Sequence, residues 1–189
     1  GGCVIELHCV FVNATLGDSD VVCFPKNVSV SSYESWIKLT GNSPGKIIIG
    51  QDANANIFAV GINNGTLFFN DGSIDYPGNK LVNDGVWHHI AAIYDGYSQL
   101  SLFVDGILDT TYTVYLGQII QSPPLNNPPA STLAVQIAAA VNIDLQVDEV
   151  RVWNYNLSLG ELASHMNSSV SPTASGLVAY FKFDEGTGS

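Results

Sequence analysis

Two adjacent histidines, His88 and His89, are the first residues of this sequence whose types suggest chemistry. They follow Trp87 and open an apolar run that ends in Asp95-Gly96. Imidazole nitrogens bind metals and transfer protons near neutral pH. Neighbouring residues of a β-strand point to opposite faces of the sheet, so this pair cannot bind one metal from one face. We expect both histidines to be structural, with their ring nitrogens hydrogen-bonded to backbone or to a neighbouring side chain.

The elements that must position these histidines are predicted to be short strands. Residues 3–11 alternate between apolar and polar types, and residues 87–94 and 100–104 are rich in apolar strand formers. Asp105-Gly106 then fits a tight type I′ hairpin turn. Turn residues recur at short intervals along the chain, which indicates an all-β sandwich.

One short helix is predicted at residues 159–166. Ser158 and Glu161 have the spacing of a capping box, in which each side chain bonds the backbone amide of the other residue. Leu159, Leu162 and Met166 then form an apolar stripe with helical spacing.

We expect a single domain over residues 1–189, with two ends that can pair in different ways. Residues 1–11 form a possible N-terminal extension strand. Residues 176–189 are predicted to form a C-terminal strand, which belongs either to its own domain or to a neighbouring copy. Residues 121–131 carry four prolines and are predicted to be an exposed loop. The alternative for that loop is a peptide-ligand or O-glycosylated segment.

Composition narrows the classes of partner. Apolar residues make up 46% of the 189 residues, which is enough for a sizeable core. The formal net charge of −11 repels phosphate backbones and anionic lipid, so we expect neither nucleic acid nor membrane insertion. The apolar run at 133–141 is too short to span a bilayer.

Three cysteines, Cys3, Cys9 and Cys23, lie near the start of the sequence and fit no zinc motif. An odd number allows one intramolecular disulfide with one cysteine left over, or no disulfide at all. We favour Cys9–Cys23, since both lie on predicted strands. Cys3 is then the candidate for a free thiol or an intermolecular bond.

Five Asn-X-Ser/Thr sequons favour a secreted, extracellular and glycosylated protein. Their asparagines are Asn13, Asn27, Asn64, Asn156 and Asn167. The sequence also opens on Gly1-Gly2 without a methionine, which we interpret as a mature or excised segment.

Several segments resemble a known family. Residues 84–108 carry Trp-His-His, a Tyr-Asp-Gly turn and a strand that ends in Asp-Gly, and residues 147–162 combine a strand with a short helix. In this order they resemble laminin G-like domains of the concanavalin A-like lectin/glucanase superfamily. Segments 31–41, 17–25 and 176–186 show weaker similarity. The resemblance implies a two-sheet antiparallel jelly-roll sandwich, with Trp36, Trp87 and Trp153 as core anchors.

The same superfamily includes glucanases, so catalysis must be considered. Retaining glycosidases need two carboxylates about 5–5.5 Å apart. The related glucanases carry them as Glu-X-Asp-X-Glu. The nearest acids here are Asp144 with Asp148-Glu149 and the pair Asp184-Glu185, and neither group has that spacing with a glutamate on each side. We therefore assign no catalytic residue and predict that the protein is not an enzyme.

Calcium is the one cofactor that the sequence suggests, since relatives often carry it at the rim of the sandwich. Asp18 and Asp20 supply carboxylates close together, and Asp148 lies where the strand alternation breaks, as at a β-bulge. The alternative is that these acids are solvated in turns, or bond backbone amides or Arg151.

Sugar binding usually requires exposed aromatic side chains. The candidates at strand ends are Tyr76, Tyr97, Tyr112 and Tyr115, with ordinary packing at the rim as the alternative.

The sequence leaves two hypotheses for the function. The first is a heavily glycosylated structural or adhesive module, a repeat or protomer of a larger assembly such as a fibre, whose partners are its own copies or neighbouring modules. The alternative is a lectin-like module that binds glycans, with or without calcium.

Overall fold

A computed structural model gives the structure of residues 7–15, 18–25, 32–41, 46–51, 59–71, 74–95, 97–114, 132–133 and 144–183, and the structural statements below concern these ranges. The chain forms, in order, β1 (Leu7–Thr15), β2 (Asp18–Pro25), β3 (Ser32–Thr40), β4 (Lys46–Gln51), β5 (Ala59–Asn63), β6 (Thr66–Asn70), β7 (Asp75–Leu81), β8 (Asp84–Tyr94), β9 (Gln99–Val104), β10 (Ile107–Thr113), β11 (Thr132–Leu133), β12 (Asp144–Trp153), α1 (Leu159–Asn167) and β13 (Leu177–Phe181).

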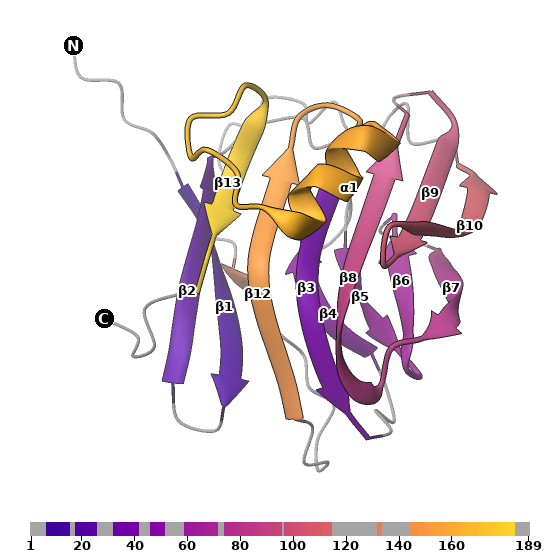
Figure 1. Cartoon of the computed structure of the whole chain (residues 1–189). Coiled ribbons are helices and arrows are strands. Elements are labelled where there is room, and N and C mark those ends of the chain that lie inside the picture. Colours follow the sequence, from indigo (N-terminus) through magenta and orange to yellow (C-terminus); the bar gives the residue numbers. More distant parts are fainter. Residues whose placement is uncertain are drawn as a thin grey trace.

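The strands form an antiparallel sandwich (Figure 1). One sheet has six strands in the order β10-β9-β8-β3-β12-β13, and a four-stranded sheet, β4-β5-β6-β7, lies behind it. A third sheet, β11-β1-β2, lies beside β12 and β13, and its β1–β11 pair is parallel. The arrangement confirms the predicted all-β jelly-roll class.

Strand alternation builds the core between the two larger sheets. Tyr33, Ile37 and Leu39 of β3 point inward, together with Ile90 and Ala92 of β8. They meet apolar side chains of the four-stranded sheet, namely Val60, Ile62, Leu67 and Phe69. Each large apolar side chain buried in this way stabilises the fold by about 1.5–3 kcal/mol.

Helix α1 covers part of the opposite, outer face of the six-stranded sheet (Figure 1). Leu162 of α1 packs there with Trp153 and Phe103 in a second apolar cluster. Ser158 caps the helix, and its reciprocal bonds with Glu161 form the predicted capping box. In the part of the chain that is described, no helix is long and apolar enough to cross a membrane.

Two tight hairpin turns use left-handed backbone. Asp105 and Gly106 have φ of 55° and 72°, as the predicted type I′ turn requires, and Asn64-Gly65 repeats this pattern with 52° and 81°. A Cβ added at Gly106 would lie 2.8 Å from the sulfur of Met166 in α1. The β9–β10 turn therefore packs closely against the helix.

The break in alternation near Asp148 is a bulge. The pairing of β12 with β3 shifts register between Asp148 and Arg151, and Glu149 has φ of 51°. The predicted bulge is confirmed, and it turns the Glu149 side chain toward Arg151.

The two predicted terminal strands differ in how much of each is described. β13 pairs with β12 of the same chain. β1 spans Leu7–Thr15 and pairs with β2, whereas residues 1–6 lie outside the described residues. The proline-rich loop at 121–131 also lies outside them.

The backbone register of β1 and β2 sets Cys9 directly opposite Cys23. Opposed residues of antiparallel strands have Cα atoms about 4.5–5.5 Å apart, within the range of disulfides. We therefore predict that peptide mapping without reductant finds a Cys9–Cys23 linkage. Reduction should cost about 3 kcal/mol of folding free energy for a loop of this size. The variant Cys3→Ser should keep the linkage, whereas three free thiols would contradict it.

Candidate functional site

The side chain of His88 links the start of β8 to the β9–β10 turn. Its Nδ1 lies 3.0 Å from Asp105 Oδ2 and its Nε2 lies 3.1 Å from Asp84 Oδ1, while Lys80 Nζ donates to Asp105 Oδ2 at 2.6 Å. Partial burial alone would raise the pKa of Asp105, but the bonds from Lys80 and His88 outweigh it and lower that pKa below 3.8. His88 is therefore structural, as predicted.

His89 points to the opposite face, beneath α1. Its ring meets Trp36 edge-on, with centroids 5.4 Å apart, and its Nε2 lies 3.3 Å from Glu34 Oε2. The Nε2–Oε2 pair is an ion-pair contact outside hydrogen-bond geometry, and Nδ1 has no hydrogen-bond partner among the described residues. The prediction that the ring nitrogens of this histidine are hydrogen-bonded is therefore wrong, because the ring meets Glu34 only as an ion-pair contact and meets Trp36 edge-on.

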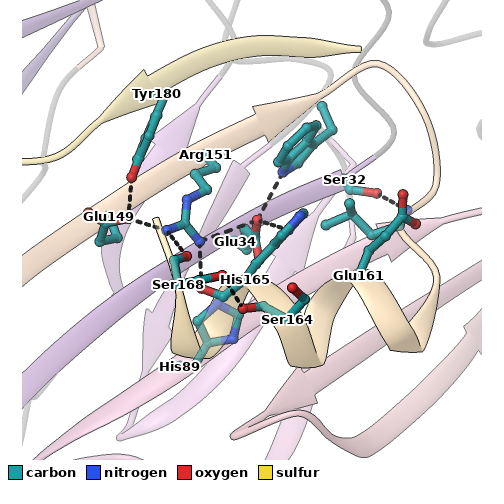
Figure 2. A network of polar contacts seen from close by, with 12 residues as sticks. Ser32, Glu34, His89, Glu149, Arg151, Glu161, Ser164, His165, Ser168 and Tyr180 are labelled. Carbon is teal, nitrogen blue, oxygen red and sulfur yellow. Dashed lines mark hydrogen bonds and ion pairs between the residues drawn. The ribbon is translucent and has the colours of Figure 1, made fainter. Parts of the chain in front are cut away.

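Around His89 lies a group of ionisable side chains that we call the buried charge cluster: Glu34, His89, Arg151 and His165 (Figure 2). Glu34 Oε1 accepts from Trp153 Nε1 at 3.0 Å and lies 2.9 Å from His165 Nδ1. Arg151 Nη1 lies 3.7 Å from the same oxygen. The cluster thus joins β3, β8 and β12 to α1.

Arg151 extends the cluster toward β13. It pairs with Glu149, donates to the carbonyl of His165 at 3.1 Å, and lies over the Tyr180 ring (Figure 2). Tyr180 in turn donates to Glu149 at 2.5 Å. Glu149 therefore bonds Arg151, which is the alternative to metal binding raised by the sequence.

The buried charge cluster is placed to hold the fold together rather than to act on a ligand. Glu34 and His89 are fully buried and Arg151 is 1% exposed, so a substrate cannot reach them. Among the described residues, no group of three His, Cys, Asp or Glu side chains is placed to hold a metal ion. Burial alone would raise the pKa of Glu34, but contact with His89 and the charges of His165 and Arg151 outweigh it and hold the pKa below 4.5.

Beyond the end of α1, no element of the described ranges covers the same sheet face. In Figure 1 the helix crosses the upper parts of β3, β8 and β12, and no other labelled element lies in front of their lower parts. The register puts Lys38 opposite both Trp87 and Gln146, and Trp36 opposite both His89 and Asp148. We call the set Trp36, Lys38, Trp87, Gln146 and Asp148 the tryptophan face.

The tryptophan face corrects the predicted roles of the tryptophans. Trp153 is 1% exposed and is a core anchor, as predicted. Trp87 is 41% exposed and lies outside both core clusters, so its prediction as a core anchor is wrong. Trp36 is partly exposed and packs on His89. The reason is that both side chains share the outer face with His89 by strand parity, and neither belongs to the apolar cluster beneath α1.

The tyrosine candidates divide between packing and exposure. Tyr76 and Tyr112 pack together, with ring centroids 5.3 Å apart, and Tyr112 donates to the carbonyl of Pro77 at 2.5 Å. Tyr97 is 83% exposed on the β8–β9 turn. Tyr115 lies outside the described residues.

The calcium candidates are not brought together by the described contacts. Asp18 and Asp20 lie in β2, opposite Thr15 and Val12, rather than in a free turn. Asp148 lies at the β12 bulge in another sheet and accepts from the Glu149 amide at 2.8 Å. A calcium site at these residues stays a prediction.

Comparison with known families identifies the class of protein to which the chain belongs. The profile of a laminin G family, described as "Concanavalin A-like lectin/glucanases superfamily", matches residues 14–163. This is more than half of the chain, and the chain belongs to this family. No curated protein sequence matches it.

Solved structures with the same fold include binding domains. One is a protein from Bacteroides ovatus ATCC 8483 described as a "putative carbohydrate binding protein", with TM-score 0.61, 19% identity, and coverage of 95% of this chain and 49% of that one. Another comes from work on botulinum neurotoxin type C, whose cell entry depends on two ganglioside molecules (TM-score 0.59, 14% identity, coverage 86% and 44%). A third is the binding domain of botulinum neurotoxin DC in complex with rat synaptotagmin II, with TM-score 0.60, 16% identity, and coverage of 86% of this chain and 46% of that one. The chain spans about half the length of each of these structures.

The buried charge cluster predicts a defined pH dependence of stability. Because the folded pKa of Glu34 is lowered, its ionised form stabilises the fold above the ordinary pKa of 4.5, and this stability is lost as pH falls through the lowered value. We expect Glu34→Gln to cost about 3 kcal/mol at neutral pH. The difference from the wild type should shrink below pH 4.5 in urea unfolding.

Glu161→Gln is the matched control, because glutamine also completes a capping box. This substitution should lower the free energy of unfolding by about 0.5 kcal/mol, the low end of the range for helix caps, because the cap is altered but retained. Stability curves of wild type and Glu34→Gln that run parallel down to acid pH would contradict the role of Glu34.

Proposed function

We propose that this chain is a non-catalytic carbohydrate-binding module of a secreted protein, and that it binds through the tryptophan face. The observation that carries the proposal is the exposure of Trp87, 41% exposed, on a sheet face shared with the partly exposed Trp36. Large exposed aromatics on an ordered sheet face are typical of interaction sites.

The chemistry of this face suits sugars. A pyranose ring has an apolar face of C–H groups and a rim of hydroxyls, so it can stack on an indole ring while its rim bonds polar groups. Lys38 supplies donors, Gln146 both donors and acceptors, and Asp148 acceptors. All three lie beside the tryptophans in the register of β3 with β8 and β12.

The comparisons support this proposal over a structural role. The Bacteroides protein is described as carbohydrate binding. Strand-mediated assembly into a fibre has weaker support, because β13 pairs with β12 of its own chain. Catalysis is disfavoured because Glu34 is buried and Glu149 is paired with Arg151.

The proposal predicts sugar binding that depends on Trp87. Trp87→Ala should weaken binding at least tenfold, which is about 1.4 kcal/mol, because it removes the stacking surface. Trp87→Phe should retain part of the affinity. Isothermal titration against the best ligand from a glycan array measures both variants.

The matched control for Trp87→Ala is Tyr97→Ala, which removes a more exposed aromatic away from the tryptophan face. Tyr97→Ala should bind as the wild type does. Equal binding by Trp87→Ala and wild type would refute the site, and a preparation that binds no glycan would refute the proposed function.

Secretion and glycosylation belong to the same proposal. Asn64, Asn156 and Asn167 are exposed, and Asn64 lies in the β5–β6 turn. Asn13 lies in β1, and Asn27 lies outside the described residues. We predict that protein from a eukaryotic secretory host loses mass on treatment with an N-glycosidase, with Asn64, Asn156 and Asn167 occupied. An unchanged intact mass would count against this prediction.

A further inference from the structure

We infer that the ligand of the tryptophan face is an uncharged, extended polysaccharide that is bound along its chain, with at least two sugar residues stacked at once. This inference rests on the proposed function and adds the class of ligand. It follows from the spacing of the two tryptophans, from the openness of the face and from the charges around it.

The spacing of the tryptophans provides two separate stacking positions. Trp36 is paired with His89, and Trp87 precedes His89 by two residues on the same face. The two tryptophans are therefore diagonal neighbours on adjacent strands, a relation that separates residues by about 7–8 Å. Each indole is large enough to stack one pyranose ring, so one chain that contacts both must present two rings.

Trp36 is held in a fixed position by the neighbouring side chain on β8. The buried ring of His89 meets it edge-on at 5.4 Å, and His89 in turn contacts Glu34 of the buried charge cluster. A stacking surface whose orientation is fixed before binding costs less conformational entropy when it takes up a ligand. The contact therefore favours a ligand that needs Trp36 and Trp87 in one constant arrangement.

The openness of the face favours the middle of a chain over its end. The five side chains project from neighbouring strands of one sheet, and α1 covers only the other part of that face (Figure 1). Recognition of a single terminal sugar usually needs a concave pocket that buries most of the ligand. An extended chain can instead lie across β3 and β8 with both of its ends in solvent.

The charges favour an uncharged ligand. Lys38 and Asp148 are the one cation and the one anion of the tryptophan face, so the face has no excess positive charge. The whole sequence has 17 acidic and 6 basic residues, with a formal net charge of −11. A negative field of this kind repels uronate, sulfate and sialate groups. Neutral hydroxyls can bond both Lys38 and Asp148 without that cost.

The test is titration with neutral oligosaccharides of increasing length, from monomer to hexamer, in the cello-, laminari-, xylo- and manno- series. Polygalacturonate fragments, heparin fragments and sialyllactose serve as the acidic and terminal-sugar probes. For at least one neutral series, affinity should rise at least tenfold between monomer and tetramer, and should change little with salt. Trp36→Ala and Trp87→Ala should each abolish that rise with length, while thermal unfolding checks that both variants are folded.

Lys182→Gln provides the matched charge control, because Lys182 lies over the Tyr180 ring of β13, outside the tryptophan face. It should leave the affinity for the neutral chain within threefold of the wild type. Binding of an acidic probe more tightly than of every neutral chain would overturn the inferred ligand class. So would Trp87-dependent binding that is as strong for a monosaccharide as for the tetramer. In both cases the proposed function would stand, whereas it falls if no sugar binds or if neither tryptophan matters.

Discussion

One buried carboxylate organises this fold. Glu34 lies in the middle of the six-stranded sheet with no exposure to solvent, on the face that α1 covers. A buried charge is tolerated only when partners compensate for its lost hydration. Trp153, His165 and Arg151 supply that compensation from β12 and α1, and His89 contributes from β8. The contact of His165 with Glu34 therefore helps to hold α1 on this part of the sheet, together with the packing of Leu162 on Trp153.

This constraint also determines where the face stays open. Because His165 must reach Glu34, α1 lies across the part of the sheet that holds Glu34 and Trp153. In the register of β3 with β8, Trp36 and Trp87 lie beyond Glu34 and its partner Ala91. Among the described elements, none lies in front of the lower parts of β3 and β8 in Figure 1. His89 links the two parts, since it contacts Glu34 on one side and Trp36 on the other. The buried charge cluster, which stabilises the fold, and the proposed binding surface thus lie on one sheet face.

Local features of the fold were predictable from the sequence because they depend on neighbouring residues. The Asp105-Gly106 turn, the capping box at Ser158 and the bulge near Asp148 are all set by short-range backbone chemistry. The opposite orientations of His88 and His89 follow in the same way from strand parity.

The features that depend on which distant elements meet were not predictable. Glu34 looks like a solvated strand residue until Arg151 and His165 are known to lie beside it. The family resemblance implied that Trp87 is a core anchor, but the burial of an outward-facing strand residue depends on whether another element covers that part of the sheet.

The most direct test of the central claim is a crystal structure of the chain with a bound neutral oligosaccharide. The account predicts successive sugar rings stacked on Trp36 and Trp87, with hydroxyls bonded to Lys38, Gln146 or Asp148. An oligosaccharide bound elsewhere, with the tryptophan face left free, would contradict it.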